Sequence, residues 1–156
     1  TVGSDEPRKR LGLVKDIISR LDSEVSKDIN LVNIGSEIRL DEDQLIASFQ
    51  HAEALLFPSV SEGFGYPPAE AMAAGCKVLA SDSAAHNEII PNNYLLPVDE
   101  IRAWVDAVEV IHSEWKMNKG QQRQANNNLI QHVRNLLSPS AHGTALSKAY
   151  DSLFEE

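Results

Sequence analysis

Residues 54–82 read ALLFPSVSEGFGYPPAEAMAAGCKVLASD. The apolar run at 54–57 predicts a strand, the glycines at 63 and 65 predict a flexible loop, and the prolines at 67 and 68 predict the first turn of a helix over 67–74. Glycines let a backbone approach a ligand closely, and the amino end of a helix favours a negative charge. The stretch therefore predicts an anion site between a strand and a helix.

Two acidic residues flank this loop, Glu62 before the glycines and Glu70 in the helix that follows. Ionised carboxylates only accept hydrogen bonds, and they would repel a phosphate if they pointed at it. We therefore expect them to accept hydrogen bonds from ligand hydroxyl groups on either side of the phosphate. A ligand with phosphates in the middle and hydroxyl-rich sugars at both ends is a nucleotide-sugar.

The same stretch resembles the signature of retaining glycosyltransferases of the GT-B fold, group 1 and family-4-like, in which seven residues separate two glutamates. The shared positions are Pro58, Ser59, Glu62, Gly63, Phe64, Gly65, Pro67, Glu70, Ala71, Met72, Ala73, Gly75 and Val78. The chain departs from the pattern at Lys77, where the family usually has proline. The resemblance implies a Rossmann-like three-layer αβα fold with a parallel sheet, the second half of a GT-B enzyme.

Flanking segments extend the resemblance over most of the chain. Residues 41–52 are similar to the family's acidic turn and helix, 81–89 to its serine-rich loop, and 94–98 to its next strand. Residues 2–9 resemble its first strand and basic loop, in which Lys9 matches the lysine that holds the diphosphate. The family's arginine is replaced by Ser4, which leaves Arg8 or Arg10 as its substitute.

The resemblance implies a role for each site residue. Glu70 would bind the ribose, and Glu62 would be the catalytic residue beside the transferred sugar. Arg8 and Lys9 would hold the diphosphate. The stretch Gly63, Phe64, Gly65 and Tyr66 would complete the substrate-binding residues, largely through backbone amides. Neither a metal nor a cofactor is implied, because amides and lysine can stabilise the departing diphosphate.

A length of 156 residues suits one domain, and we expect residues 1–156 to be a single nucleotide-sugar-binding domain. We expect the amino-terminal acceptor domain to be absent. The full enzyme would transfer a hexose from a UDP- or GDP-sugar to an acceptor glycan or lipid-linked sugar, as in polysaccharide biosynthesis. The isolated chain would bind the nucleotide-sugar without transferring it, because half a cleft cannot position an acceptor.

Composition excludes some classes of partner and indicates where the protein acts. The formal net charge of −9 argues against a nucleic-acid partner. No apolar run reaches the roughly 18 to 20 residues that span a bilayer, and no signal peptide is recognisable. We expect a cytoplasmic location, with peripheral membrane contact at the inner face through the absent half. The single cysteine, Cys76, is expected to be a small buried residue, and the five histidines lack metal-ligand spacing.

Hydrophobic periodicity predicts alternating helices and strands. Helices are expected over 11–25, 84–89 and 114–135. Three more helices are expected to start at capping residues: one at Asp41, which forms a capping box with Gln44, one at Asp99, and one at Ser138 and Pro139 that continues through 154. Strands are expected at 29–34, 77–80 and 94–96. Trp104 and Trp115 are expected to be core or helix-contact residues. Only one strand precedes Asp41, so either a strand and helix pair is deleted between residues 10 and 41 or the polar stretch conceals one.

Two alternatives stay open at this level. One is a nucleotide-binding domain without catalytic activity. The other is a flavodoxin-like or receiver-type signalling domain, in which Asp82 is the only candidate for a phosphorylated aspartate at a strand end.

Overall fold

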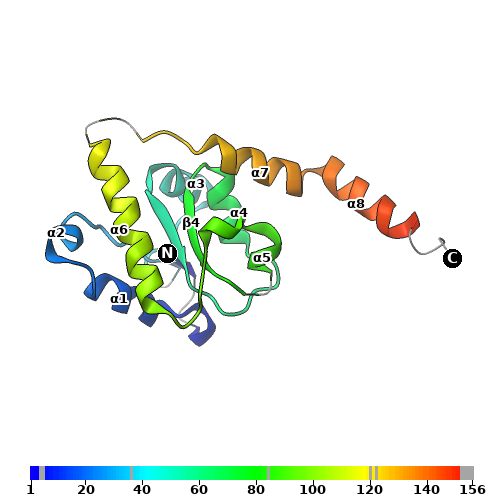
Figure 1. Cartoon of the computed structure of the whole chain (residues 1–156). Coiled ribbons are helices and arrows are strands. Elements are labelled where there is room, and N and C mark those ends of the chain that lie inside the picture. Colours follow the sequence, from blue (N-terminus) through cyan, green and yellow to red (C-terminus); the bar gives the residue numbers. More distant parts are fainter. Residues whose placement is uncertain (4–5, 36, 84, 120, 122, 152–156) are drawn as a thin grey trace.

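The computed structural model describes residues 1–3, 6–35, 37–83, 85–119, 121 and 123–151 of the chain (Figure 1). All strand pairs within these residues are parallel, and they form two groups. The first group pairs β1 (Val2–Gly3) with β2 (Ile34–Gly35). The second has the order β3-β4-β5 and consists of β3 (Ala54–Phe57), β4 (Lys77–Ser81) and β5 (Leu95–Leu96).

Helices connect these strands. They are α1 (Leu11–Ser19), α2 (Ser23–Ser26), α3 (Glu42–His51), α4 (Tyr66–Ala73), α5 (His86–Ile89), α6 (Ile101–Met117), α7 (Asn127–Leu137) and α8 (Pro139–Asp151), with short 3-10 turns η1 (Pro7–Lys9) and η2 (Asn92–Tyr94).

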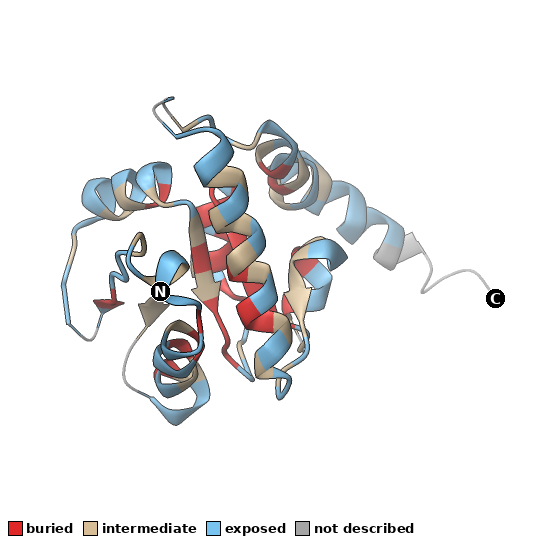
Figure 2. Ribbon diagram, turned by 60° about the vertical axis from the view of Figure 1, so that its left-hand side comes forward, coloured by how far each residue is buried: buried red, intermediate tan, exposed pale blue. Residues whose placement is uncertain are grey.

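Alternating side chains of the central strands form two apolar cores, one on each face. Leu55 and Val78 pack with residues of α3, α4 and α7, whereas Leu56 and Leu79 pack with α1 and α6. Successive residues of a strand point to opposite faces, so both faces of β3 and β4 are covered by helices. Figure 2 shows buried residues along the central strands and on the helix faces toward them. The predicted Rossmann-like αβα arrangement is thereby confirmed.

Local capping signals set several helix ends as predicted. Asp41 accepts the backbone N–H of Gln44, and the Gln44 side chain accepts the backbone N–H of Asp41, which forms the capping box of α3. The Ser138 hydroxyl accepts the N–H of Ala141 at the start of α8. The predicted end of this helix at 154 lies outside the described residues.

Core side chains also lie as predicted. Cys76 is fully buried just before β4, and burial raises the pKa of its thiol to about 11, which keeps it protonated and unreactive. Trp104 is fully buried between α6 and the sheet, where its ring N–H donates to the carbonyl of Pro97.

Two expected elements differ from the structure. The predicted strand 29–34 shrinks to Ile34–Gly35, because only Val2 and Gly3 of β1 lie beside it as a pairing partner. The predicted helix 11–25 breaks after Ser19, and Asp22 caps the separate helix α2 by accepting the N–H of Glu24. Between residues 10 and 41 the described residues form α1, α2 and β2, with no further strand and helix pair.

The prediction of one helix over 114–135 is wrong. Helix α6 ends at Met117, and α7 starts at Asn127 after Asn126, whose side chain accepts the backbone N–H groups of Asn128 and Leu129. The predicted cap at Asp99 is also wrong: Glu100 is the N-cap residue of α6 and makes no side-chain cap, while Asp99 pairs with Arg10 at 3.2 Å.

Helix α8 continues beyond α7 and extends away from the body of the molecule (Figure 1). None of the helices in the described part of the chain is long and apolar enough to cross a membrane.

Candidate functional site

The predicted site residues come from loops at the carboxyl ends of the parallel strands. Lys9 follows β1, Glu62 follows β3, and His86 follows β4. Carboxyl ends of neighbouring parallel strands lie at one edge of a sheet, and ligands of such folds bind there. β1 lies beside β3 although the two are not hydrogen-bonded as a ladder, which brings Lys9 and Glu62 together across 53 positions of sequence.

Glu62 is the centre of a hydrogen-bonded cluster. Its Oε1 accepts Lys9 Nζ at 2.5 Å, the hydroxyl of Ser59 at 2.6 Å and Arg8 Nη1 at 3.1 Å. The side chains of Lys9 and Glu62 are only 11% and 10% exposed. The Lys9 ammonium also lies 4.9 Å from the centre of the Phe57 ring, a cation–π contact. The Lys9 ammonium and the Glu62 carboxylate are therefore held in place and largely shielded from water.

Burial by itself raises the pKa of Glu62, but the hydrogen bonds of Lys9 and Ser59, the charge of Lys9 and the hydrogen bond of Arg8 together lower it below its ordinary value. Glu62 is consequently an ionised acceptor at neutral pH. A carboxylate of this kind can accept hydroxyl hydrogen bonds and can stabilise a developing positive charge nearby.

The structure distinguishes the two arginines proposed to replace the family's arginine. Arg8 donates to the Ser61 carbonyl at 3.0 Å and reaches Glu62, whereas Arg10 donates to the Val98 carbonyl at 2.7 Å and to Asp99. Arg8 therefore belongs to the cluster and Arg10 supports the loop after β5. Ser4 lies outside the described residues.

The glycine loop ends at Gly65, which has a φ of 87° and is the N-cap position of α4. A Cβ added at Gly65 would lie 3.4 Å from the His86 ring, whereas nothing lies within 4 Å of one added at Gly63. Because Pro67 and Pro68 lack N–H groups, the first turn of α4 offers fewer amides than an ordinary helix start. The amides of residues 63–66 are therefore the candidates for binding an anion at this loop.

The aromatic residues of the loop lie at different depths. Phe64 is half-buried and packs against the core that contains α4, and its ring centre lies 5.0 Å from that of Tyr66. Tyr66 is 69% exposed. Phe64 therefore anchors the loop, and Tyr66 presents an exposed ring at the start of α4.

Glu70 lies on the exposed side of α4, and within the described part of the chain its side chain forms no hydrogen bond or ion pair. The structure thus brings Arg8, Lys9 and Glu62 into one cluster and leaves Glu70 outside it.

Two residues of the site have contacts that sequence reasoning missed. Ser59 is fully buried; its hydroxyl donates to Glu62, and its carbonyl accepts the hydroxyl of Ser81, which ties the end of β3 to the end of β4. The spacing Pro-Ser-x-x-Glu was the available signal, because an ST-type side chain three positions before an acid can reach it.

His86 is the second such residue. Its ring is fully buried, and Nδ1 lies 3.0 Å from the carbonyl of Ser81, a contact that requires the proton on Nδ1. Nε2 is then an acceptor, and among the described residues it has no hydrogen-bond partner. Burial lowers the pKa of His86 against the opposing effect of the Ser81 hydrogen bond. Its place in the loop after Ser81 was the sequence signal.

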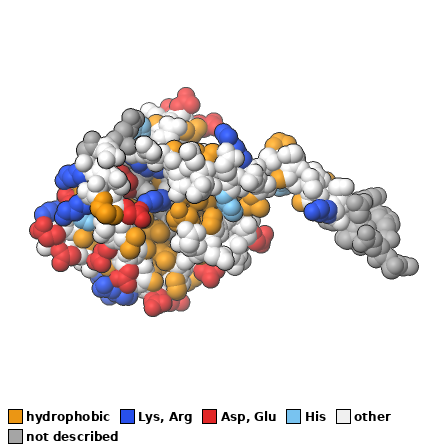
Figure 3. Space-filling view, turned by 45° about the horizontal axis from the view of Figure 1, so that its top comes forward, with side chains coloured by type: hydrophobic (Ala, Val, Ile, Leu, Met, Phe, Trp, Pro, Cys, Tyr) orange, Lys and Arg blue, Asp and Glu red, His pale blue; other side chains and the backbone are white. Residues whose placement is uncertain are grey.

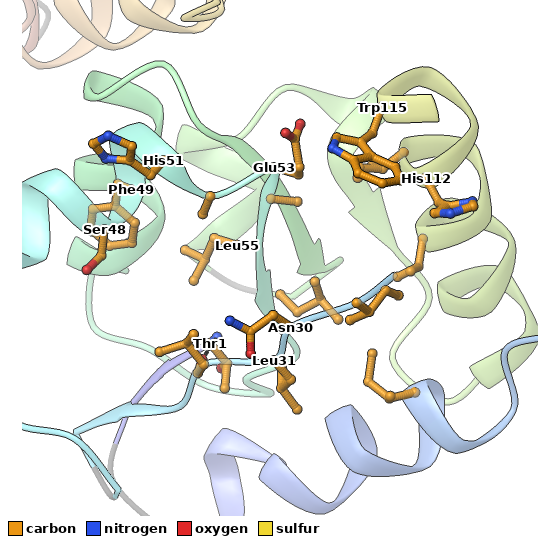
Figure 4. A pocket seen from close by; sticks show the side chains of 18 of the residues that line it. Thr1, Asn30, Leu31, Ser48, Phe49, His51, Glu53, Leu55, His112 and Trp115 are labelled. Carbon is orange, nitrogen blue, oxygen red and sulfur yellow. Dashed lines mark hydrogen bonds between the residues drawn. The ribbon is translucent and has the colours of Figure 1, made fainter. Parts of the chain in front are cut away.

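A cavity of about 560 Å³ lies elsewhere, at the amino ends of β1 and β3, and neither Glu62 nor Glu70 lines it (Figure 4). Among the described residues no group of three or more His, Cys, Asp or Glu side chains is placed to hold a metal ion. On the face drawn in Figure 3, acidic and basic side chains are interspersed, without a continuous basic surface.

Comparisons with known proteins agree on one family. The family model described as Glycosyl transferases group 1 matches residues 37–128. The chain is 39% identical over 71 residues to the O-antigen chain mannosyltransferase RfbU of Salmonella typhimurium, which covers 44% of this chain and 20% of that protein. It is 33% identical over 103 residues to the Putative glycosyltransferase 41 of Sulfolobus islandicus filamentous virus, which covers 64% and 31% respectively. The aligned region is thus a fifth to a third of these relatives.

Solved structures share the fold. The catalytic domain of cholesterol-alpha-glucosyltransferase from Helicobacter pylori superposes with a TM-score of 0.68 at 13% identity, over 86% of this chain and 95% of that one. Sucrose-phosphate synthase from Thermosynechococcus elongatus superposes with a TM-score of 0.59 at 25% identity, over 98% of this chain and 37% of that one.

Proposed function

The chain belongs to the family Glycosyl transferases group 1 and has the Rossmann-like fold of GT-B glycosyltransferases, and from this premise we propose that it binds the nucleotide-diphosphate sugar of a retaining enzyme. The observation that carries the proposal is the cluster of Arg8, Lys9 and Glu62 beside the glycine loop, at the carboxyl ends of β1 and β3. Membership of this family rules out the alternative of a receiver-type signalling domain.

The cluster supplies the groups for a diphosphate. Lys9 Nζ and Arg8 Nη1 share a single carboxylate oxygen, Glu62 Oε1, and Arg8 Nε pairs with Glu6 at 2.7 Å. The N–H groups that remain on the two side chains are the ones that would bind phosphate oxygens. The amides of residues 63–66 add neutral donors at the amino end of α4. Arg8 is the more exposed of the two cations, with 41% of its side chain accessible.

The two glutamates take different parts of the ligand in this proposal. Glu62 lies next to the cations and would accept hydroxyl hydrogen bonds from the sugar and stabilise positive charge at the anomeric carbon as the bond to the diphosphate breaks. Glu70 is exposed and unpaired in the described structure, so its carboxylate can accept both hydroxyl groups of a ribose.

We propose that the whole enzyme transfers a hexose with retention of configuration to a glycan or lipid-linked acceptor. Because RfbU is named a mannosyltransferase, a mannosyl nucleotide is the first sugar donor to test. The acceptor would be held by a further domain facing this site, so the present chain should bind the nucleotide-sugar but not transfer its sugar. A cytoplasmic location is part of the same proposal, in agreement with a single unpaired cysteine.

Calorimetric titration of the chain with UDP, GDP, ADP and their hexose conjugates tests the proposal. We expect one nucleotide class to bind with a Kd on the order of 0.1 to 1 mM, and Glu70→Gln and Lys9→Met each to weaken it by about tenfold or more. The matched control is Asp16→Asn, which removes an exposed carboxylate of α1 outside the cluster.

Equal affinity of the wild-type chain and Glu70→Gln would contradict the assignment of the ribose site. Sugar transfer by the 156-residue chain alone, measured as nucleotide release that depends on an acceptor, would contradict the need for a second domain.

A further inference from the structure

His86 lies directly beneath the glycine loop, and its ring is fully buried. The Cδ2–Nε2 edge of the ring faces Gly65, because a Cβ added at Gly65 would lie 3.4 Å from Cδ2 and 3.7 Å from Nε2. The ring also packs edge-to-face against Phe57, with the two ring centres 5.4 Å apart, and the same Phe57 ring contacts the Lys9 ammonium. His86 is therefore one side chain away from the proposed diphosphate site.

One ring nitrogen of His86 has partners and the other has none. Nδ1 lies 3.0 Å from the Ser81 carbonyl, which can only accept, so the proton of the neutral ring is on Nδ1. Nε2 then carries a lone pair, and within the part of the chain that the structure describes this buried atom has no hydrogen-bond partner. Buried polar atoms of native proteins are nearly always paired, so Nε2 is a candidate for a partner that arrives with a ligand.

A polar network joins His86 to Glu62. The Ser83 hydroxyl lies 3.2 Å from His86 Nδ1 and donates to the Ser59 carbonyl at 3.4 Å. The Ser59 hydroxyl donates in turn to Glu62 Oε1 at 2.6 Å. The imidazole ring and the carboxylate of the cluster are therefore held in fixed positions relative to each other.

The surroundings of His86 favour its neutral form. Burial lowers the pKa of His86 below its ordinary value of 6.5, against the opposing effect of the Ser81 hydrogen bond. Of the charged groups in the cluster, the Glu62 carboxylate raises this pKa and the Lys9 ammonium lowers it. The ring is accordingly neutral in the free chain at pH 7 and above.

Phosphate groups bound at the glycine loop would change this balance. The elements around the ring carry further titratable side chains, namely the exposed Asp82, Glu88 and Glu70, and His132, which lies 2.9 Å from a carbonyl of α5. Exposed charges are screened by water and salt. Phosphates held by the amides of residues 63–66 would instead lie on the Nε2 side of the ring with little water between them, and would favour its protonated form.

We propose that His86 is a positioning residue that takes up a proton from solvent at Nε2 when the diphosphate of a nucleotide-sugar binds over the glycine loop. The imidazolium would add a third positive charge to those of Arg8 and Lys9, and its new N–H would face the loop at Gly65. This inference rests on the proposed nucleotide-sugar site and adds to it a proton that binds together with the ligand. The affinity should therefore rise as the pH falls through neutrality.

Calorimetric titration at pH 6 and pH 8 tests the proposal. The ligand is GDP-mannose, or whichever other hexose conjugate of UDP, GDP or ADP binds best, because the diphosphate of a nucleotide-sugar has no group that titrates in this interval. We expect the affinity to be about five- to tenfold higher at pH 6. Titrations at pH 7 in buffers of different ionisation enthalpy should show net proton uptake on binding.

His86→Asn is the informative variant, because its amide can donate to the Ser81 carbonyl as Nδ1 does but cannot take up a proton. It should weaken binding much more at pH 6 than at pH 8, and proton uptake should disappear. His51→Asn makes the same change at an exposed residue of α3 whose Nδ1 also contacts a backbone carbonyl, that of Ala47. This control should keep the pH dependence of the parent.

Nitrogen-15 NMR of the unchanged chain answers the same question without a substitution in the core. The Nε2 signal of His86 should change from that of an unprotonated nitrogen to that of a protonated one when the nucleotide-sugar is added at pH 7.

Equal affinity at pH 6 and pH 8, with Nε2 unprotonated in the complex, would overturn this inference and leave the proposed function in place. An equal loss of affinity at both pH values in His86→Asn would also overturn it, because a purely structural role predicts that result. If no nucleotide-sugar binds at either pH, the proposed function fails and this inference fails with it.

Discussion

At the scale of single residues, the environment of Glu62 decides its chemistry. Its carboxylate is largely buried, yet three donors from two loops hold it ionised. Lys9 is equally buried and depends on Glu62 as its ion-pair partner. Removing one member of such a pair leaves the other charge uncompensated, which costs more than the pair itself contributes.

We therefore expect Glu62→Gln to lower the free energy of unfolding by about 2 kcal/mol at pH 7. The folded-state pKa of Glu62 is lowered below its ordinary value of 4.5, so its contribution is present above that pH and is lost as the pH falls through the folded-state pKa. The difference between the two proteins should accordingly shrink in acid. Urea unfolding at a series of pH values measures both effects.

The control for this prediction is Glu70→Gln, which makes the same chemical change at an exposed position that has no ion-pair partner among the described residues, and which should stay within about 0.5 kcal/mol of the parent at pH 7. Equal losses in the two variants would show that the cluster does not stabilise the fold.

At the scale of elements, the segment between α6 and α7 is held by contacts rather than by helix propensity. Arg123 donates to the carbonyls of Gln50 and Gly75, and the N–H of Asn126 donates to Gly75 as well. Gly75 has a φ of 73°, and a Cβ added there would come within 2.7 Å of Ala125. The turn from α4 to β4 and the start of α7 therefore pack closely against each other at Gly75.

Gly75→Ala should lower the free energy of unfolding by about 2 kcal/mol or more, because it combines backbone strain with a clash against the chain at 125–126. Gly12→Ala is the matched control: Gly12 is in helix α1 with open space around it, so the substitution should stabilise the protein by about 0.5 to 1 kcal/mol. Denaturant unfolding of both variants checks the opposite signs. If Gly75→Ala leaves the free energy of unfolding unchanged, residues 125–126 can move away from the added Cβ at no cost.

At the scale of the whole molecule, two apolar cores hold helices on both faces of β3 and β4, while β1 and β2 form a separate pair. Thr1 is half-buried beside these groups, and its amino group donates to the Val32 carbonyl at 2.8 Å. Folding therefore places a titratable group with an ordinary pKa of 8.0 in surroundings that lower it to about 6.

The unfolded chain binds a proton at Thr1 between pH 6 and 8 that the folded chain does not, so stability should rise with pH in this interval, by about 2 kcal/mol in total. His86, whose pKa is also lowered by burial, acts in the same direction as the pH falls through its ordinary value of 6.5. Thermal unfolding from pH 6 to 8 measures the slope. Acetylation of Thr1 should remove the contribution of the amino group over the whole interval and leave that of His86 near and below pH 6.5; an unchanged slope after acetylation would contradict the assignment.

Sequence patterns recovered the elements whose signals are local. The capping box at Asp41, the apolar strand before Ser59 and the proline turn of α4 all lie within a few residues of one another, so short-range periodicity predicted them. The predictions of a strand at 29–34 and of one helix over 114–135 were wrong. Strand formation upstream of Ile34 requires a partner strand, and the break before Asn127 depends on contacts with Gly75 and Gln50.

The sequence by itself determined a parallel α/β fold and the glycine loop between two glutamates, because periodicity, turn residues and motif spacing are properties of neighbouring residues. Only the tertiary structure decided that Lys9 and Arg8 pair with Glu62, that the Nε2 atom of His86 is buried against Gly65, and that the strands form two groups with a cavity between them. Lys9 and Glu62 are 53 positions apart in the sequence, and Gly65 and His86 are 21 positions apart. The formation of these contacts depends on how the strand ends align in space, which no local pattern records.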